Sequence, residues 1–319
     1  MFIQISYVFC VLNTAEKNIP AALNLLVAAS LIVTALFLLW LASRLPLPAS
    51  LVIGLLFAML LLTNYQLIHE ATHGLLHPSP GVNESVGMLL SWLFPVSLTL
   101  MKVTHIVHHC CNRSDHEMFD CYYPGDSRIL KYFQWYGLLF GLWWWLVPVG
   151  SLLLALNPRW LYSRPFRKAR TTTRLFDDFS AREIRRVRVE TVFGLLFWVL
   201  AFQLLQLEWS AMLILYGMFG FNWSTRQYVT HAFSPRDVIN GAWNLRVGRL
   251  HGAMLLNGQW DRVHHQHPHV SWIHLPELAR GKAFDLGYWQ QYRRLWRGPR
   301  CCREKGPRCL PRQGYEGLS

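Results

Sequence analysis

The stretch ASLVIGLLFAMLLLTNYQLIHEATH, residues 49–73, joins an apolar run to a pair of histidines. Residues 49–68 match the length of about 20 apolar residues that a helix needs to cross the hydrocarbon core of a bilayer. His69 and His73 come directly after this run, and residues four apart lie on one face of a helix. The stretch therefore predicts a membrane helix that ends in two imidazoles able to bind one metal ion.

Three further apolar runs have comparable lengths. Residues 20–43 precede the first stretch, and the proline-rich residues 44–48 separate the two runs as a tight turn. Residues 191–207 and 210–225 form a second pair, interrupted at Glu208. The sequence thus predicts an all-α integral membrane protein, in which two hairpins supply four transmembrane helices, over 20–43, 49–68, 191–207 and 210–225.

Two other apolar segments are expected to be embedded or interfacial rather than spanning. Residues 86–101 are short and contain Pro95, and residues 134–156 contain Pro148. If residues 86–101 crossed alone, the histidines on either side of them would be separated by the membrane. A model with six spans, in which residues 134–156 cross twice or pair with residues 86–101, is the alternative.

The composition argues against a soluble protein. Of the 319 residues, 52% are hydrophobic and 15% are charged, whereas soluble domains carry about 25% charged residues. The net charge of +13 would suggest nucleic acid in a soluble protein. Here the basic residues lie between and after apolar runs, so they favour a face against anionic lipid headgroups, and no nucleic-acid partner is expected.

The basic residues also predict the orientation. Residues 158–190 hold ten Lys and Arg against four acidic residues, and such loops stay in the cytoplasm. All 14 histidines fall within residues 69–116 and 231–274. If they share one centre, both zones lie on the same side, so the sequence predicts a histidine-rich cap on the cytoplasmic side.

The expected organisation is an N-terminal segment, a membrane domain and a tail. We place the segment at residues 1–19, the domain at 20–280 and a basic, partly disordered tail at 281–319. The seven cysteines are odd in number and show no spacing typical of a disulfide framework. Reduced thiols on a cytosolic face are therefore expected.

Two further histidine clusters come later in the chain. His105, His108 and His109 are spaced i, i+3, i+4 and share one helical face. Such a triplet is costly unless its members bind something. The third cluster contains the pair at 264–265 and is preceded by the isolated His231, which stands where the last span should leave the membrane.

The candidate ligands are too numerous for one ion. Imidazole and carboxylate ligands suit iron, and open positions then permit oxygen chemistry. A zinc hydrolase using His69-Glu70-x-x-His73 is an alternative, although zinc needs only about four ligands. A histidine-rich metal transporter is a third possibility. The candidates are His69, His73, His105, His108, His109, His231, His264 and His265, together with Asp261 or His267.

These clusters together resemble the membrane fatty acid desaturase superfamily, whose pattern is HxxxH, HxxHH, HxxHH. The matching stretches are residues 69–73, 105–109 and the region ending at 263–268, and residues 272–276 resemble the stretch that these enzymes carry after the third box. The resemblance covers roughly residues 50–280. It implies an enzyme with two iron ions that uses O2 to introduce a double bond into a fatty acyl chain.

One position departs from the family pattern. The third box of the family begins with a histidine three residues before the His pair, where this chain has Asp261. Asp261 can bind iron through oxygen, His267 can bend back, or a water held by Asn257 can take the place. The change leaves a hydroxylase, a ketolase or a decarboxylating terminal-alkene-forming enzyme of the same superfamily open as alternatives.

The resemblance also implies partners. Electrons would come from a separate ferredoxin or cytochrome with its reductase, and the substrate would be a lipid-like acyl chain entering from the membrane. The second ring nitrogen of each metal-bound histidine needs a hydrogen-bond acceptor. Candidates for this role are Glu70, Asp115, Glu117, Asp120, Asp237 and Asn222.

Overall fold

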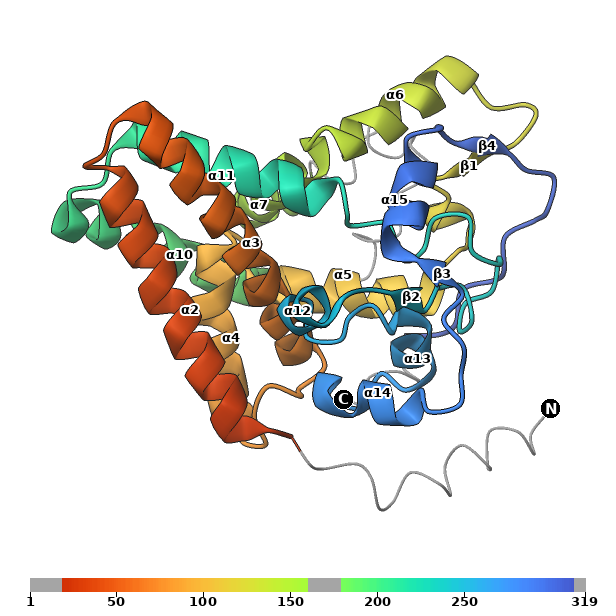
Figure 1. The fold of residues 1–319 in the computed structure, drawn as a ribbon, viewed down its shortest axis with the longest axis horizontal. Coiled ribbons are helices and arrows are strands. Elements are labelled where there is room, and N and C mark those ends of the chain that lie inside the picture. The colour runs from red at the N-terminus through yellow and green to blue at the C-terminus, as the bar shows by residue number, and fades with distance from the viewer. Residues whose placement is uncertain (1–18, 160–178, 313–319) are drawn as a thin grey trace.

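The computed structural model describes residues 19–159 and 179–312 and is mostly helical (Figure 1). Its longer helices are α2 (Ala21–Ala42), α3 (Leu47–Thr72), α4 (Pro80–Leu93), α5 (Leu98–Cys111), α6 (Arg128–Leu139), α7 (Leu142–Leu156), α10 (Ala181–Leu205), α11 (Trp209–Ser224) and α15 (Tyr288–Leu295). Short helices are η1 (Asp115–Glu117), α12 (Arg249–Met254), α13 (Asp261–Gln266), η3 (Trp272–His274) and α14 (Leu275–Leu278).

Helices α2 and α3 form the first predicted hairpin. The chain turns at Ser43–Pro46, and the hydroxyl of Ser50 donates a hydrogen bond to the carbonyl of Ala42 across the turn (3.0 Å). One stripe of α2 is buried, whereas Val33 and Phe37 on the outside are 68% and 52% exposed. Large apolar side chains exposed along a helix are stable against lipid rather than water.

Helices α10 and α11 follow one another where the second hairpin was predicted, but α11 packs mainly against α3, and α10 against α7 and α5. α10 begins at Ala181, ten residues before the predicted start, because Ser180 and Glu183 form a capping box there. The turns of the two hairpins meet: the Ser43 hydroxyl accepts from the Glu208 N–H (3.0 Å), and Arg44 donates to the carbonyl of Leu205 (3.1 Å). Both turns lie at the left of Figure 1, so the opposite ends of these helices face the rest of the protein.

Helices α2, α3 and α10 are long and apolar enough to cross a membrane, and up to five segments qualify if each of two bent helix pairs counts as one span. The bent pairs are α4 with α5, at 96°, and α6 with α7, at 86°. The first pair confirms the predicted interruption, and the second corrects the position of the other. The first breaks around Pro95, and the second breaks at Gly141, not at Pro148, which lies inside α7. Gly141 has φ +100°, a left-handed conformation that favours glycine.

Residues 225–312 form a C-terminal cap beside α5, at the end of the molecule away from the hairpin turns (Figure 1). The parallel pair β1 (Cys121–Tyr122) and β4 (Arg300–Cys301) joins the cap to the segment after α5, and the parallel pair β2 (Leu245–Arg246) and β3 (Leu286–Gly287) lies within the cap. These pairings hold together segments that are about 40 and 180 residues apart in the chain.

The segment from residue 281 to 312 is folded, in contrast to the predicted partial disorder. The Trp135 indole donates to the carbonyl of Leu295 (2.8 Å), and the N–H of Leu310 donates to the carbonyl of Cys110 (2.8 Å). Cys111 and Cys309 form a disulfide, so the expectation of reduced thiols fails for this pair. The buried side chains of Tyr288 and Leu295 also hold residues 281–312 against the rest of the protein. The other described cysteines, which are not part of this disulfide, are Cys110, Cys121, Cys301 and Cys302.

Candidate metal centre

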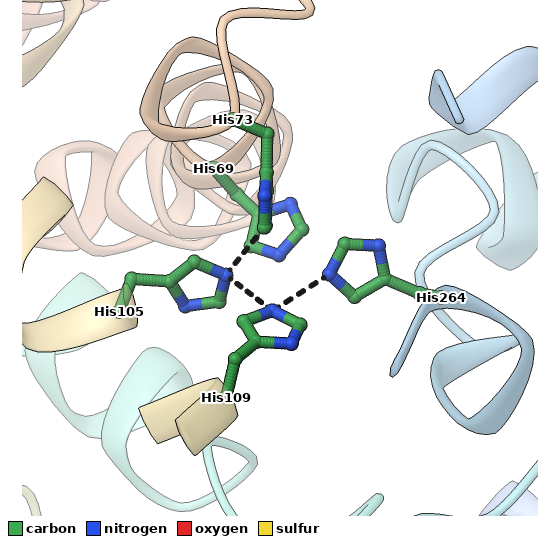
Figure 2. Close-up of side chains that lie close together, drawn as sticks. All are labelled: His69, His73, His105, His109 and His264. Carbon is green, nitrogen blue, oxygen red and sulfur yellow. Dashed lines mark hydrogen bonds between the residues drawn. The ribbon is translucent and has the colours of Figure 1, made fainter. Parts of the chain in front are cut away.

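The first group of histidines contains five imidazoles from three helices. His69 stands in the last turn of α3 and His73 caps its end, His105 and His109 project from α5, and His264 comes from α13. Figure 2 shows the five rings pointing toward one another from these separate elements. One ligand atom from each lies within 4.8 Å of all the others.

The separations between these nitrogens fit a common metal ion. His105 Nε2 lies 2.8 Å from His73 Nε2 and 3.0 Å from His109 Nε2, which in turn lies 3.1 Å from His264 Nε2 (Figure 2). Zinc binds imidazole nitrogen at about 2.0–2.1 Å, so neighbouring nitrogens around one ion of this size are about 3 Å apart. The residues of the first group therefore fit a metal ion.

The second group contains His108, His231 and His265, whose ligand atoms also lie within 4.8 Å of one another. Asp261 lies against it: Oδ2 is 2.9 Å from His231 Nε2, and Oδ1 is 3.9 Å from His265 Nε2. The two groups are adjacent, because the ring centroids of His109 and His265 are 4.3 Å apart. On both α5 and α13, one histidine of the adjacent pair belongs to the first group and the other to the second, because neighbouring residues on a helix point in different directions.

Hydrogen bonds to oxygen atoms outside the second group orient two of its histidines. His108 Nδ1 donates to Glu117 Oε2 at 2.6 Å, and His231 Nδ1 donates to the carbonyl of Gly241 at 3.2 Å. A ring nitrogen that donates to an oxygen fixes the tautomer and leaves the other nitrogen free to bind a metal. Sequence reasoning found Glu117 but missed Gly241, since a backbone carbonyl carries no residue-type signal.

Four of the other proposed acceptors have partners outside the two groups. Asp115 pairs with Arg236 (2.7 Å) and Asp120 with Arg113 (2.7 Å). Asp237 accepts backbone N–H groups in its own loop, and Asn222 donates to the carbonyl of Ala58. These four side chains stabilise the surrounding loops and helices rather than the histidine rings.

Glu70, the remaining proposed acceptor, connects α3 to the segment that comes after the third histidine box. Its Oε2 accepts from the Ser271 hydroxyl at 3.0 Å and from the Trp272 N–H at 3.2 Å. Its other oxygen is 3.9 Å from His69 Nδ1, too far for a hydrogen bond. Glu70 therefore fastens the segment after α13 to α3, and so helps to bring His264 toward His69.

His267 belongs to neither group. It caps the end of α13, half-buried, and its ring contacts that of His269, with centroids 6.2 Å apart. The side-chain amide of Asn257 donates to the carbonyl of Trp272 at 3.2 Å. Of Asp261, His267 and Asn257, the three residues considered for the departure in the third box, only Asp261 lies next to the second group.

The electrostatics of α13 suit metal binding. Burial and the neighbouring imidazoles lower the pKa of His264 and of His265 well below the usual value, so both rings are neutral. Burial opposes ionisation of Asp261, but the adjacent His231 outweighs it and holds the pKa of the carboxyl well below its usual range. Neutral imidazoles and an ionised carboxylate are the forms that bind metal.

The model of the family described as "Fatty acid desaturase" matches residues 42–296. The chain belongs to the fatty acid desaturase family. A search of curated proteins finds no match. The matched range includes α3, both histidine groups and Asp261, which confirms the resemblance drawn from the three boxes. Family membership supports a membrane oxidoreductase of the desaturase type, and the two histidine groups are compatible with its metal centre.

Proposed function

We propose that this chain is a di-iron membrane enzyme that uses O2 to introduce a double bond into a fatty acyl chain. The observation that carries the proposal is the pair of adjacent histidine groups, which supply eight imidazoles from segments as distant as residues 69 and 265. Eight imidazoles exceed the coordination number of a single ion, whereas one ion in each of the two groups accounts for all of them. Iron combines this ligand preference with redox chemistry, which zinc lacks.

The proposed ligands of the first ion are the five histidines of the first group. The second ion takes His108, His231 and His265, with Asp261 supplying an oxygen. Bound iron would supply the activation of O2 for attack on a C–H bond. The chain's own residues orient the imidazoles through Glu117 and Gly241, and they bury the centre away from water.

The zinc hydrolase alternative is disfavoured by Glu70. In an HExxH enzyme the glutamate acts as a general base beside the metal. Here the Glu70 carboxylate is buried and accepts two hydrogen bonds from Ser271 and Trp272. It therefore serves as a connection between segments rather than as a base.

We place the centre at the cytoplasmic surface of a protein with four transmembrane helices, α2, α3, α10 and α11. The two hairpin turns meet at one end of these helices, and the histidine groups stand at the other. The acyl substrate would reach the centre from the membrane. Electrons would come from a separate ferredoxin or cytochrome with its reductase. The net charge of +13 would favour the docking of an acidic carrier.

Two measurements test the proposal. Metal analysis of the purified protein should find about two iron ions per chain, the number that two separate donor groups imply. Incubation with O2, an electron source and acyl substrates should yield a product lighter by two hydrogens, as seen by mass spectrometry. Gain of oxygen would favour a hydroxylase or ketolase, and loss of the carboxyl carbon an alkene-forming enzyme. One zinc ion and no iron would contradict the proposal.

A further inference from the structure

A cleft of about 410 Å³ opens beside the first turns of α10, where they pass α4. It lies at the same end of α10 as the histidine groups, since the other end of that helix meets the hairpin turn at Arg44. The cleft is separate from those groups, because its described lining contains no histidine. That lining consists of Met88, Arg182, Arg185, Arg186, Val189 and Glu190.

The charge in this cleft is not balanced. The Glu190 carboxylate is buried and accepts three hydrogen bonds from Ser97 and Thr99 at 2.6–2.8 Å, which fix the start of α5. Arg186 pairs with Glu84 at 2.9 Å. Arg182 and Arg185 are exposed, and within residues 19–159 and 179–312 neither has an ion pair or hydrogen bond. Glu190, the carboxylate in the lining, is 3.7 Å from Arg186, so Arg182 and Arg185 face the cleft without an ion pair to any described residue.

The same face of α10 continues as an apolar stripe. Val189 lines the cleft, and Val192, Phe193, Leu196 and Leu200 come next at helical spacing, each 51–55% exposed. At 1.5 Å per residue, the stripe from Val189 to Leu200 is about 16 Å long, close to half of the roughly 30 Å bilayer core. The basic cleft therefore matches a lipid headgroup, and the apolar stripe, about one leaflet deep, matches an acyl chain.

We propose that this face of α10 binds a phospholipid with an anionic phosphate headgroup. The phosphate occupies the cleft between Arg182 and Arg185, and an acyl chain lies along the stripe. Guanidinium groups bind phosphate oxygens with paired hydrogen bonds, which suits two arginines whose charge the described residues leave unpaired. The stripe favours a lipid over free phosphate and over an acidic protein, because neither of those would use the apolar surface.

Native mass spectrometry of the full-length, delipidated protein in detergent micelles can test this. Phosphatidylglycerol should be retained about ten- to thirty-fold more strongly than phosphatidylcholine with the same chains, from about 1 kcal/mol for each of two arginines. The double variant Arg182→Gln with Arg185→Gln should lose the preference. The matched control, Arg246→Gln with Arg249→Gln, removes the same charge from exposed positions outside the cleft and should keep it.

Three outcomes would overturn the proposal. Equal loss of the preference in both double variants would mean that only net charge matters. Displacement of the lipid by millimolar inorganic phosphate would mean that the cleft holds a free anion and that the stripe contributes nothing. A cleft variant that keeps phosphatidylglycerol but no longer binds an acidic ferredoxin would identify a protein-docking surface instead.

Discussion

The two histidine groups share α5 and α13 but differ in their ligands. The first contains five imidazoles and, among the described residues, no carboxylate. The second contains three imidazoles with Asp261 against them and Glu117 behind His108. A set of imidazole ligands adds no negative charge to a metal ion, whereas the carboxylate of Asp261 offsets one unit of its positive charge directly. The two positions of the proposed centre are therefore chemically unequal.

This difference arises from one residue in an otherwise regular pattern. A histidine at position 261 would give the third box the family's HxxHH spacing, and its ring would stand where the Asp261 carboxylate now lies beside His231. An anionic ligand stabilises a higher charge on the ion it binds. We therefore expect the second position to favour the more oxidised state of iron. Substitutions in the first and in the second group can test whether the two positions differ.

Loss of one imidazole from either group should have the largest effect. His264→Ala and His108→Ala remove a ligand from the first and second group respectively. Each should lower activity more than about 100-fold, since even the loss of an outer partner of a ligand typically costs 10–100-fold. Activity assays and iron analysis measure both effects. His77→Ala, outside both groups, is the control, and full activity in either ligand variant would disprove the assignment.

Substitution of Asp261 should affect the second group alone. Asp261→Ala should lower bound iron from about two ions toward one per chain, because the first group keeps its five imidazoles. Asp261→His should restore binding and make the two iron environments more alike in Mössbauer spectra. A variant Asp261→Ala that keeps two irons with unchanged spectra would show that the carboxylate is not a ligand.

Much of the fold can be derived from local pattern. The apolar runs predicted α2 and α3 closely because length and hydropathy are properties of the segment itself. The bend at Gly141 was missed because Pro148 looked like the stronger break, although a single proline is tolerated inside a helix in this setting. The folding of residues 281–312 was missed because it depends on partners such as Trp135 and Cys111, which are distant in the chain.

The site divides in the same way. The i, i+3 and i+4 spacing predicted three histidines close together on α5, and the two groups contain eight of the candidate histidines in all. The division into two groups was not readable, because it depends on how α5 meets α13. His267 is close in sequence to the ligands, but α13 ends before it and turns it away from both groups. Proximity in sequence is a weak guide once a helix has ended.

Glu117 should have an intermediate effect, confined to the second group. Glu117→Gln keeps the shape of the side chain but removes the negative charge of the carboxylate that accepts the hydrogen bond from His108 Nδ1. The affinity for the second iron should fall about 10–100-fold, as is typical for such partners. Competition with a graded chelator measures this. Glu277→Gln, an exposed carboxylate in a surface pair with Arg280, removes the same charge as a control. Equal iron loss from both groups would mean that Glu117 supports α5 as a whole.

Glu70→Gln should have the smallest effect, and it separates the two classes of enzyme most cleanly. The amide oxygen of Gln can accept from Ser271 and Trp272 as the carboxylate does, so a connecting role survives the change. Iron content should be unchanged and activity should fall less than about tenfold, the cost of weakening one hydrogen bond by about 1 kcal/mol. A zinc hydrolase would instead lose its general base and nearly all activity. Glu70→Ala, which removes both hydrogen bonds, should lower thermal stability in either case and so shows that the contact exists.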